Sequence, residues 1–278
     1  MADINDPVLA KPADLCCLKG DFHRGEPTGS IIQIEGVDTY VAKPDPKFTN
    51  GNVLLFFPDA FGLHINSKLM MDAYAACGYL TLGVDYFLGD AVTKYSASPL
   101  NDPNFDLAAW SAKHLLPSEE IAREWVKNIK AKYGNDGKVK FGCIGYCWGA
   151  RIVLQQLSDG GICSAGAIAH PSFVNESHVQ KSKGKMRSFR DEDDAPVAFS
   201  VPATDKLFSN EARTRVIEIC TEKQQRFNMQ VFSHVGHGFA ANRLGQSRTR
   251  LTDPYELWAK EQHFKGFVEW LDFWLARE

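Results

Sequence analysis

A cysteine in a glycine-flanked turn is the first candidate for chemistry in this chain. Cys147 lies in the segment Gly-Tyr-Cys-Trp-Gly, directly after an apolar run that is typical of a strand. Glycines two residues before and after a nucleophile allow a sharp strand-to-helix turn, because a Cβ at either place would strike neighbouring backbone. Such a turn presents one reactive side chain, so the pattern predicts that Cys147 is a nucleophile.

A carboxylate and a histidine follow the cysteine in the chain. Asp205 comes after the strand-like run 196–201, and His237 comes after the run 229–235. This order of nucleophile, acid and histidine is that of α/β-hydrolases. We therefore predict that His237 takes the thiol proton and that Asp205 orients the imidazole ring. His234 is an alternative base, but it falls within the predicted strand, whereas glycines flank His237.

Attack of a thiolate on an ester, lactone or thioester carbonyl creates an oxyanion, which needs two backbone N–H donors. Trp148, the residue directly after the nucleophile, is expected to supply one donor. The loop 58–62, which follows the strand-like run 53–57, is expected to supply the other.

These candidates need a scaffold, and strand-like runs alternate with helix-like segments along the chain. Antiparallel edge strands are expected at 31–34 and 36–42. Parallel strands are predicted at 53–57, 79–84, 138–144, 164–170, 196–201 and 229–235. Helices are predicted at 66–77 with Asn66 as N-cap, and at 105–114, 118–133, 148–157, 210–226 and 254–277. The alternation predicts an α/β-hydrolase fold, with a mostly parallel central sheet flanked by helices. We expect one domain, 1–278, with an excursion over the site at about 86–117.

Composition narrows the classes of partner and cofactor. The net charge of −3, from 31 basic and 34 acidic residues, gives no electrostatic reason to expect nucleic acid or membrane binding. The N-terminal residues lack the pattern of a signal peptide, so a cytoplasmic protein is expected. The seven cysteines lack C-x-x-C spacing, which argues against a structural zinc site or a disulfide framework. No metal or organic cofactor is expected, and monomer and homodimer both remain open. Four cysteines are expected to be inert buried thiols: Cys77, Cys143, Cys163 and Cys220.

Four segments resemble the dienelactone hydrolases, also called carboxymethylenebutenolidases. They are Pro-Asp-Ala-Phe-Gly from residue 58, Val-Asp-Tyr-Phe-Leu-Gly-Asp from 84, Gly-Tyr-Cys-Trp-Gly-Ala from 145 and Gly-His-Gly-Phe from 236. The resemblance extends from about residue 56 to the last predicted helix. It implies an α/β-hydrolase fold with a triad of Cys147, Asp205 and His237. It also implies that the Ala60 N–H is the second oxyanion donor and that Asp59 governs the ionisation of the cysteine.

The chain departs from the bacterial members of this family at two places. They have a glutamate where this chain has Asp59, and an arginine near the place of Ala241 that holds the carboxylate of dienelactone. Here the nearby arginine is Arg243. With these departures the chain resembles the eukaryotic, fungal-like branch. The alternative for Asp59 is a loop residue that caps the next helix.

Phe61, Trp110, Arg151 and Arg243 are further candidates for contact with the substrate. Two of them have a structural alternative. Arg151 could instead form a salt bridge at the surface, and Trp110 could pack with His114 on an exposed amphipathic face.

The sequence predicts a cysteine hydrolase that opens a lactone or ester of a small aromatic or polyketide-derived molecule through an acyl-enzyme. One alternative keeps the site but changes the reaction, to a thioesterase or another bond-processing enzyme of a secondary-metabolite pathway. A second alternative is a redox-sensing or binding protein in which Cys147 is oxidised and no turnover occurs.

Overall fold

A central sheet of eight strands forms the frame of the protein. The computed structural model describes residues 5–12, 25–95, 105–134, 137–184, 194–241 and 253–276, and the sheet within them has the order β10-β9-β7-β6-β4-β5-β3-β2. Only the β2–β3 and β3–β5 pairings are antiparallel, so the predicted mostly parallel sheet is confirmed. The strands are β2 (Ser30–Ile34), β3 (Val37–Ala42), β4 (Val53–Phe57), β5 (Leu80–Val84), β6 (Phe141–Tyr146), β7 (Ala165–Ala169), β9 (Val197–Pro202) and β10 (Phe227–Phe232).

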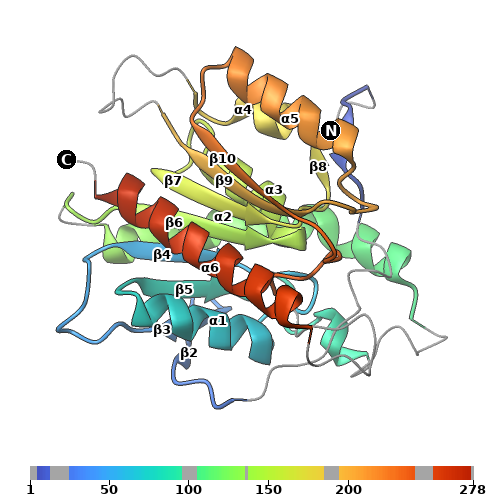
Figure 1. The fold of residues 1–278 in the computed structure, drawn as a ribbon. Helices are drawn as coiled ribbons and strands as arrows, with labels where there is room; N and C mark the ends of the chain where they lie inside the picture. The colour runs from blue at the N-terminus through green and yellow to red at the C-terminus, as the bar shows by residue number, and fades with distance from the viewer. Residues whose placement is uncertain are drawn as a thin grey trace.

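Helices cover both faces of this sheet, which explains why β4, β6, β7 and β9 are buried at every position. Successive side chains of a strand point to opposite faces. In β4, Leu54 and Phe56 belong to one core cluster, and Leu55 and Phe57 belong to the other. One face is covered by α1 (Ile65–Ala76) and α6 (Pro254–Leu275) (Figure 1). The other is covered by α2 (Leu107–Tyr133), α3 (Ala150–Gln156) and α5 (Asn210–Glu222). The protein therefore has the α/β-hydrolase fold.

One continuous helix, α2, replaces the two helices predicted at 105–114 and 118–133. Pro117 lies inside α2, and Asp106, not Ser118, caps its N-terminus. A proline normally breaks a helix because it lacks an N–H. Here contacts from outside the helix support that turn, since the carbonyl of Leu115 accepts a hydrogen bond of 2.7 Å from the buried Arg151 guanidinium.

Three further boundaries differ from the prediction. Helix α1 begins at Ile65 with His64 as its N-cap, so Asn66 lies in the first turn and is not the cap. Strand β10 ends at Phe232, so His234 is outside the strand, in a left-handed conformation with φ 56°. The predicted excursion at 86–117 contains the short 3₁₀ helix η2 (Val92–Lys94) and the first turns of α2, and residues 96–104 lie outside the described part.

The N-terminal arm, which we define as residues 5–12, was not anticipated as part of the fold. Its strand β1 (Val8–Ala10) pairs antiparallel with β8 (Val174–Asn175), just before α4 (Glu176–Lys181). The Lys11 N–H donates to the carbonyl of Leu207, and the Lys11 carbonyl accepts from the Phe173 N–H. The arm therefore joins the loops that follow β7 and β9.

Candidate active site

Five strand ends bring polar side chains to one edge of the sheet. Asp59 follows β4, Cys147 follows β6, Ser172 follows β7, Asp205 follows β9 and His237 follows β10. These strands are parallel, so their carboxyl ends lie at the same edge, where open α/β sheets form their sites.

The turn at Cys147 has the geometry of a nucleophile elbow. Cys147 has φ 48°, a left-handed conformation that is rare for a residue with a side chain. It begins the 3₁₀ helix η4 (Cys147–Gly149), which leads directly into α3. A Cβ on Gly145 would lie 2.5 Å from the carbonyl oxygen of Gly149, and a Cβ on Gly149 would lie 2.2 Å from the carbonyl oxygen of Phe57. The two glycines are therefore a steric requirement of this turn.

The structure brings Cys147, His237 and Asp205 into one hydrogen-bonded row. The His237 Nε2 atom is 3.3 Å from the Cys147 Sγ atom, and His237 Nδ1 is 2.8 Å from Asp205 Oδ2. The other oxygen, Asp205 Oδ1, accepts the Leu207 N–H at 2.8 Å, which fixes the carboxylate. All three side chains are buried, so their charges interact with little screening by water.

The electrostatics of the row favour a charged imidazole. Burial alone would lower the pKa of His237, but the negative charge of the Cys147 thiolate and hydrogen bonds to Asp205 and Cys147 outweigh burial and raise that pKa well above its usual value. A positive charge on His237 is therefore favoured beside the Cys147 sulfur.

Asp59 is a buried carboxyl beside this pair. Its Oδ1 atom accepts the Phe61 N–H at 2.9 Å, two residues along the chain, so it holds its own loop and does not cap α1. Burial and the negative charge of Cys147 raise the pKa of Asp59 to about 7. The hydrogen bond from Phe61 and the positive charge of His237 act in the opposite direction, but they are weaker. Asp59 therefore changes charge near neutral pH, at a place where that charge acts on Cys147.

The two predicted oxyanion donors, Trp148 and Ala60, lie just after the carboxyl ends of β6 and β4. Trp148 lies in the first turn of η4, where N–H groups have no partner within the helix. Ala60 is buried, and its carbonyl accepts from the Val92 N–H at 3.1 Å. Among the described residues, no acceptor bonds the Ala60 N–H.

Arg151 is part of the interior and not of the surface, which corrects the prediction of a surface salt bridge. Its guanidinium is 1 % exposed, pairs with Glu119 at 2.6 Å and lies 4.8 Å from the centre of the Trp148 ring. The Ser118 hydroxyl accepts from both the Trp148 indole N–H and the Arg151 guanidinium. These contacts fix the ring of Trp148, and with it the start of the elbow helix.

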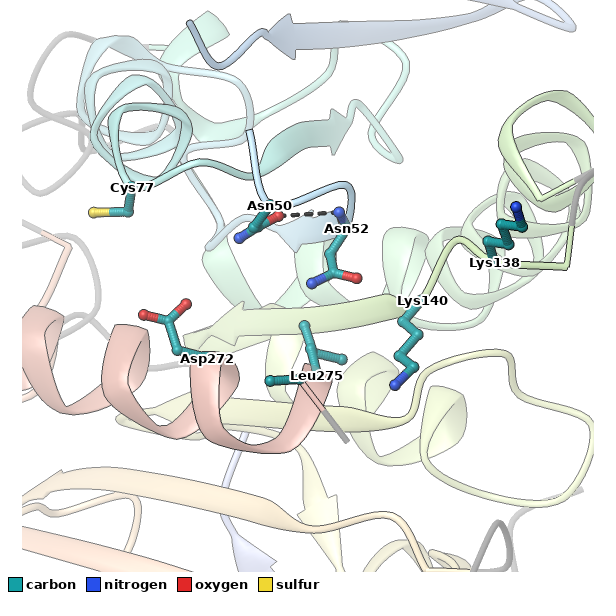
Figure 2. Close-up of a pocket in the computed structure, with 8 residues that line it drawn as sticks. Asn50, Asn52, Cys77, Lys138, Lys140, Asp272 and Leu275 are labelled. Atoms are coloured by element: carbon teal, nitrogen blue, oxygen red, sulfur yellow. Dashed lines mark hydrogen bonds between the residues drawn. The ribbon is translucent and has the colours of Figure 1, made fainter. Parts of the chain in front are cut away.

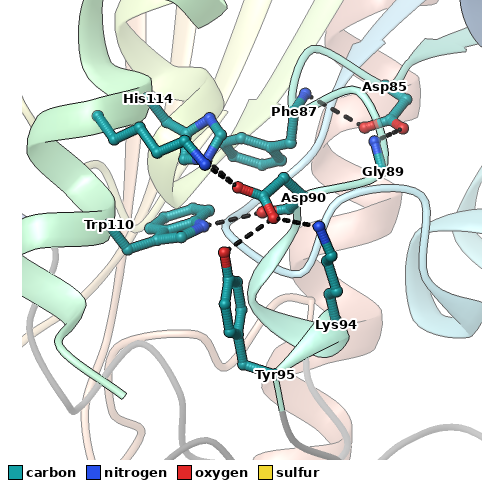
Figure 3. Close-up of polar contacts among 9 residues, drawn as sticks. Asp85, Phe87, Gly89, Asp90, Lys94, Tyr95, Trp110 and His114 are labelled. Carbon is teal, nitrogen blue, oxygen red and sulfur yellow. Dashed lines mark hydrogen bonds and ion pairs between the residues drawn. The ribbon is translucent and has the colours of Figure 1, made fainter. Parts of the chain in front are cut away.

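Trp110 and His114 are also buried, so the prediction of an exposed face is wrong. Both contact Asp90 (Figure 3). The Trp110 indole N–H donates to the backbone carbonyl of Asp90 at 2.8 Å, and His114 Nε2 lies 2.9 Å from the Asp90 carboxylate. Burial would raise the pKa of Asp90, but hydrogen bonds from Lys113, Lys94 and other neighbours lower it well below its usual value. The Asp90 cluster therefore anchors the end of the β5 loop to α2.

A groove lies at the opposite ends of the parallel strands, away from this site. Its volume is about 520 Å³ and its lining comes from residues before β4 and β6 and from the end of α6 (Figure 2). It includes Cys77, which is exposed and not buried as predicted. Partial burial and the charge of Asp272 raise the pKa of the Cys77 thiol, which keeps it protonated. The predicted burial of the other three is confirmed: Cys143, Cys163 and Cys220.

Two site residues were missed in the sequence. The Ser172 hydroxyl is 3.4 Å from the Cys147 Sγ atom, and the ring of His170 packs edge-to-face against that of His237, with centroids 5.0 Å apart. Burial and the positive charge of His237 lower the pKa of His170 well below its usual value, so its ring is neutral. The sequence feature that could have pointed to both residues is their position at, or just after, the end of the predicted strand 164–170. Arg243 lies outside the described residues, and so do the two adjacent cysteines of the N-terminal region, Cys16 and Cys17.

The described residues contain no cluster of three or more His, Cys, Asp or Glu side chains that could hold a metal ion. Within the same residues, no helix combines the length and apolarity needed to cross a membrane.

Comparison with known proteins agrees with the fold. The sequence profile of the Dienelactone hydrolase family matches residues 37–274. The chain is 94 % identical over 278 residues to "Dienlactone hydrolase 1" of Gibberella moniliformis, with 100 % of both chains covered. It is 59 % identical to "Dienlactone hydrolase 2" of the same fungus, over 98 % of this chain and 100 % of the relative. Esterase 2 of Thermogutta terrifontis, solved after phosphorylation by paraoxon, has the same fold, with TM-score 0.59 and 13 % identity over 91 % of this chain and 98 % of that one.

The fold and the elbow define an α/β-hydrolase. The chain belongs to the dienelactone hydrolase family, as the extent of the profile match and the two fungal relatives show. It is a hydrolase that acts on ester or lactone bonds, and its similarity to the fungal branch is confirmed.

Proposed function

We propose that this hydrolase uses Cys147 as its nucleophile and opens a lactone or ester of a small aromatic or polyketide-derived molecule through an acyl-enzyme. The contact of 3.3 Å between His237 Nε2 and Cys147 Sγ, with Asp205 on the far nitrogen, is the observation that carries the proposal. The substrate class draws support from the two relatives named as dienlactone hydrolases.

Acylation begins with transfer of the Cys147 proton to His237 Nε2. The thiolate attacks the carbonyl carbon, and the electron pair of the C=O bond moves to the oxygen. The N–H groups of Trp148 and Ala60 stabilise this oxyanion. When the carbonyl re-forms, the C–O bond of the ester breaks, and the leaving oxygen takes the proton from His237. In a lactone the leaving oxygen stays attached to the acyl group.

Deacylation repeats these steps with water in place of the thiol. Neutral His237 takes a proton from water as the water oxygen attacks the thioester carbon. The second oxyanion collapses, the C–S bond breaks, and Cys147 leaves as a thiolate beside the imidazolium. Throughout, Asp205 keeps the proton of the far nitrogen in place and stabilises the cation.

A comparison of substrates tests the proposed class. We expect purified protein to hydrolyse enol-lactones and aryl esters with a kcat/KM at least about tenfold above that for acyl thioesters of the same acyl group. The reason is that a stabilised oxygen leaving group departs readily once His237 supplies its proton.

Two results would redirect the proposal. A preference for acyl thioesters would indicate a thioesterase with the same site. Stoichiometric reaction of Cys147 with peroxide, and no turnover of any activated ester, would indicate a redox-sensing protein.

Asp59→Asn tests whether this carboxyl tunes the nucleophile. We expect the variant to have a higher free energy of unfolding, by up to about 4 kcal/mol at about pH 8 and by little near pH 4. The pKa of Asp59 rises from 3.8 to about 7 on folding, so ionisation reduces the stability of the folded protein as the pH rises through that window. Asparagine carries no charge and keeps the oxygen that accepts the Phe61 N–H. Urea denaturation at a series of pH values measures the difference.

Asp45→Asn is the matched control, because exposed Asp45 makes the same turn hydrogen bond to the N–H two residues later. The loss of a negative charge beside the sulfur also predicts that Asp59→Asn shifts the alkylation of Cys147 by iodoacetamide to lower pH. A stability gain that is equal at all pH values, with no shift in alkylation, would show that Asp59 is only a loop residue.

A further inference from the structure

The nucleophile has a second contact besides His237. Ser172 is fully buried, and its Oγ atom is 3.4 Å from Cys147 Sγ. The N–H of Ser172 donates to the carbonyl of Cys147 at 3.1 Å. One residue therefore holds both the side chain and the backbone of the nucleophile.

The direction of the hydroxyl hydrogen bond follows from the available acceptors. Within the described part of the chain, the sulfur of Cys147 is the only partner of the Ser172 hydroxyl. A buried hydroxyl that bonds nothing is costly, so its hydrogen points at the sulfur. When the sulfur is ionised it is purely an acceptor, and both His237 and Ser172 then donate to it.

The backbone around Ser172 is held in an unusual shape. His170 has φ 35° and Phe173 has φ 55°, which places two residues with side chains in the left-handed region on either side of Ser172. Such strain persists only where surrounding contacts enforce it. The N-terminal arm supplies one such contact, because the Phe173 N–H donates to the Lys11 carbonyl at 3.0 Å.

We infer that Ser172 is a catalytic residue, which donates a hydrogen bond to the Cys147 thiolate and stabilises it as nucleophile and as leaving group. The inference rests on the proposed role of Cys147. Ser172 forms no covalent bond and keeps its proton, since the thiol proton goes to His237. The hydrogen bond weakens as the sulfur loses its charge in acylation and strengthens again when the C–S bond breaks in deacylation.

Other groups also act on the charge of Cys147 and must be separated from Ser172. His237 faces it from the β10 loop, and Asp59 faces it from the β4 loop. Tyr86, which follows β5, and Arg151 on α3 interact with it electrostatically. None of these is altered by removal of one neutral hydroxyl, so the substitution Ser172→Ala isolates the hydrogen bond.

The test is the pH dependence of alkylation of Cys147 by iodoacetamide in Ser172→Ala and Ser172→Gly. We expect the midpoint to rise by about one pH unit, which slows alkylation about tenfold on the acid limb. The acid limb of kcat/KM should move by the same amount, and Ser172→Thr should restore both. Ser200→Ala is the control, because Ser200 is equally buried on β9 and its hydroxyl has no partner among the described residues.

The outcomes separate this inference from the proposed function. An unchanged midpoint in a folded Ser172→Ala or Ser172→Gly protein would overturn the inference, even if the melting temperature falls, because a purely structural role lowers stability alone. A shift of the same size in Ser200→Ala would overturn it as well. Hydrolysis that persists in Cys147→Ala would instead refute the proposed function, whatever Ser172 does.

Discussion

The substitution Cys147→Ala is expected to lower kcat/KM for an activated ester on the order of 10⁵-fold, with little change in stability. Removal of a nucleophile leaves only the modest catalysis that binding and oxyanion donors provide. The side chain is 2 % exposed, and alanine keeps its Cβ, so the elbow itself remains folded. Steady-state kinetics with p-nitrophenyl acetate, together with thermal melting, measure both effects.

Cys77→Ala is the control for Cys147→Ala, because Cys77 lies in the groove at the other edge of the sheet. It should retain full activity. If Cys147→Ala kept more than about a tenth of the activity while Cys77→Ala behaved like the parent, Cys147 could not be the nucleophile.

Asp205→Asn is expected to reduce kcat by about 10²- to 10⁴-fold while KM changes little. An asparagine amide group that donates toward His237 Nδ1 forces the proton onto Nε2, where it blocks acceptance of the thiol proton. It also removes the negative charge that supports the imidazolium. Asparagine can still accept the Leu207 N–H through its oxygen, so the loop should stay in place. Kinetics and a pH profile of kcat measure the change.

Asp85→Asn is a close control for Asp205→Asn. Asp85 is also buried at a strand end and accepts backbone N–H groups of its own turn, from Phe87 and Gly89. If Asp205 were only a turn residue, the two variants would have similar kinetics. A kcat for Asp205→Asn within about threefold of that for Asp85→Asn would contradict the proposed role.

The elbow could be predicted from the sequence because its requirements are local. The spacing of Gly145 and Gly149 around Cys147 follows from contacts of 2.5 Å and 2.2 Å that any Cβ would make. His237 was preferred to His234 for its flanking glycines, and the structure places His237, not His234, against the sulfur. The prediction that His234 lies within the strand is wrong, since β10 ends at Phe232.

The errors lie where tertiary contacts override local signals. Pro117 and Ser118 read as a helix boundary, but contacts with Arg151 and Trp148 keep α2 continuous there. The sequence predicts Arg151 at the surface, since no sequence pattern reveals that the partly exposed Glu119 lies beside it and pairs with its buried guanidinium. Burial of a charged side chain depends on its partner in space, which the order of residues does not show.

The contacts that the sequence could not reveal are long-range ones. The pairing of β1 with β8 joins segments that are more than 160 residues apart in the chain, and neither strand is long enough to give a periodic signal. Ser172 follows a predicted strand as Cys147 and Asp205 do, but a serine after a strand is common. Its contact with Cys147 depends on the left-handed turn at His170 and Phe173, for which glycine would be the usual signal.

Mass spectrometry of the protein mixed rapidly with a slowly hydrolysed acyl ester tests the central claim most directly. The predicted result is one added acyl group per chain, on the peptide that contains Cys147, which appears and decays at rates that match turnover. An acyl group on any other residue, or turnover with no adduct on Cys147 at any time, would contradict the mechanism.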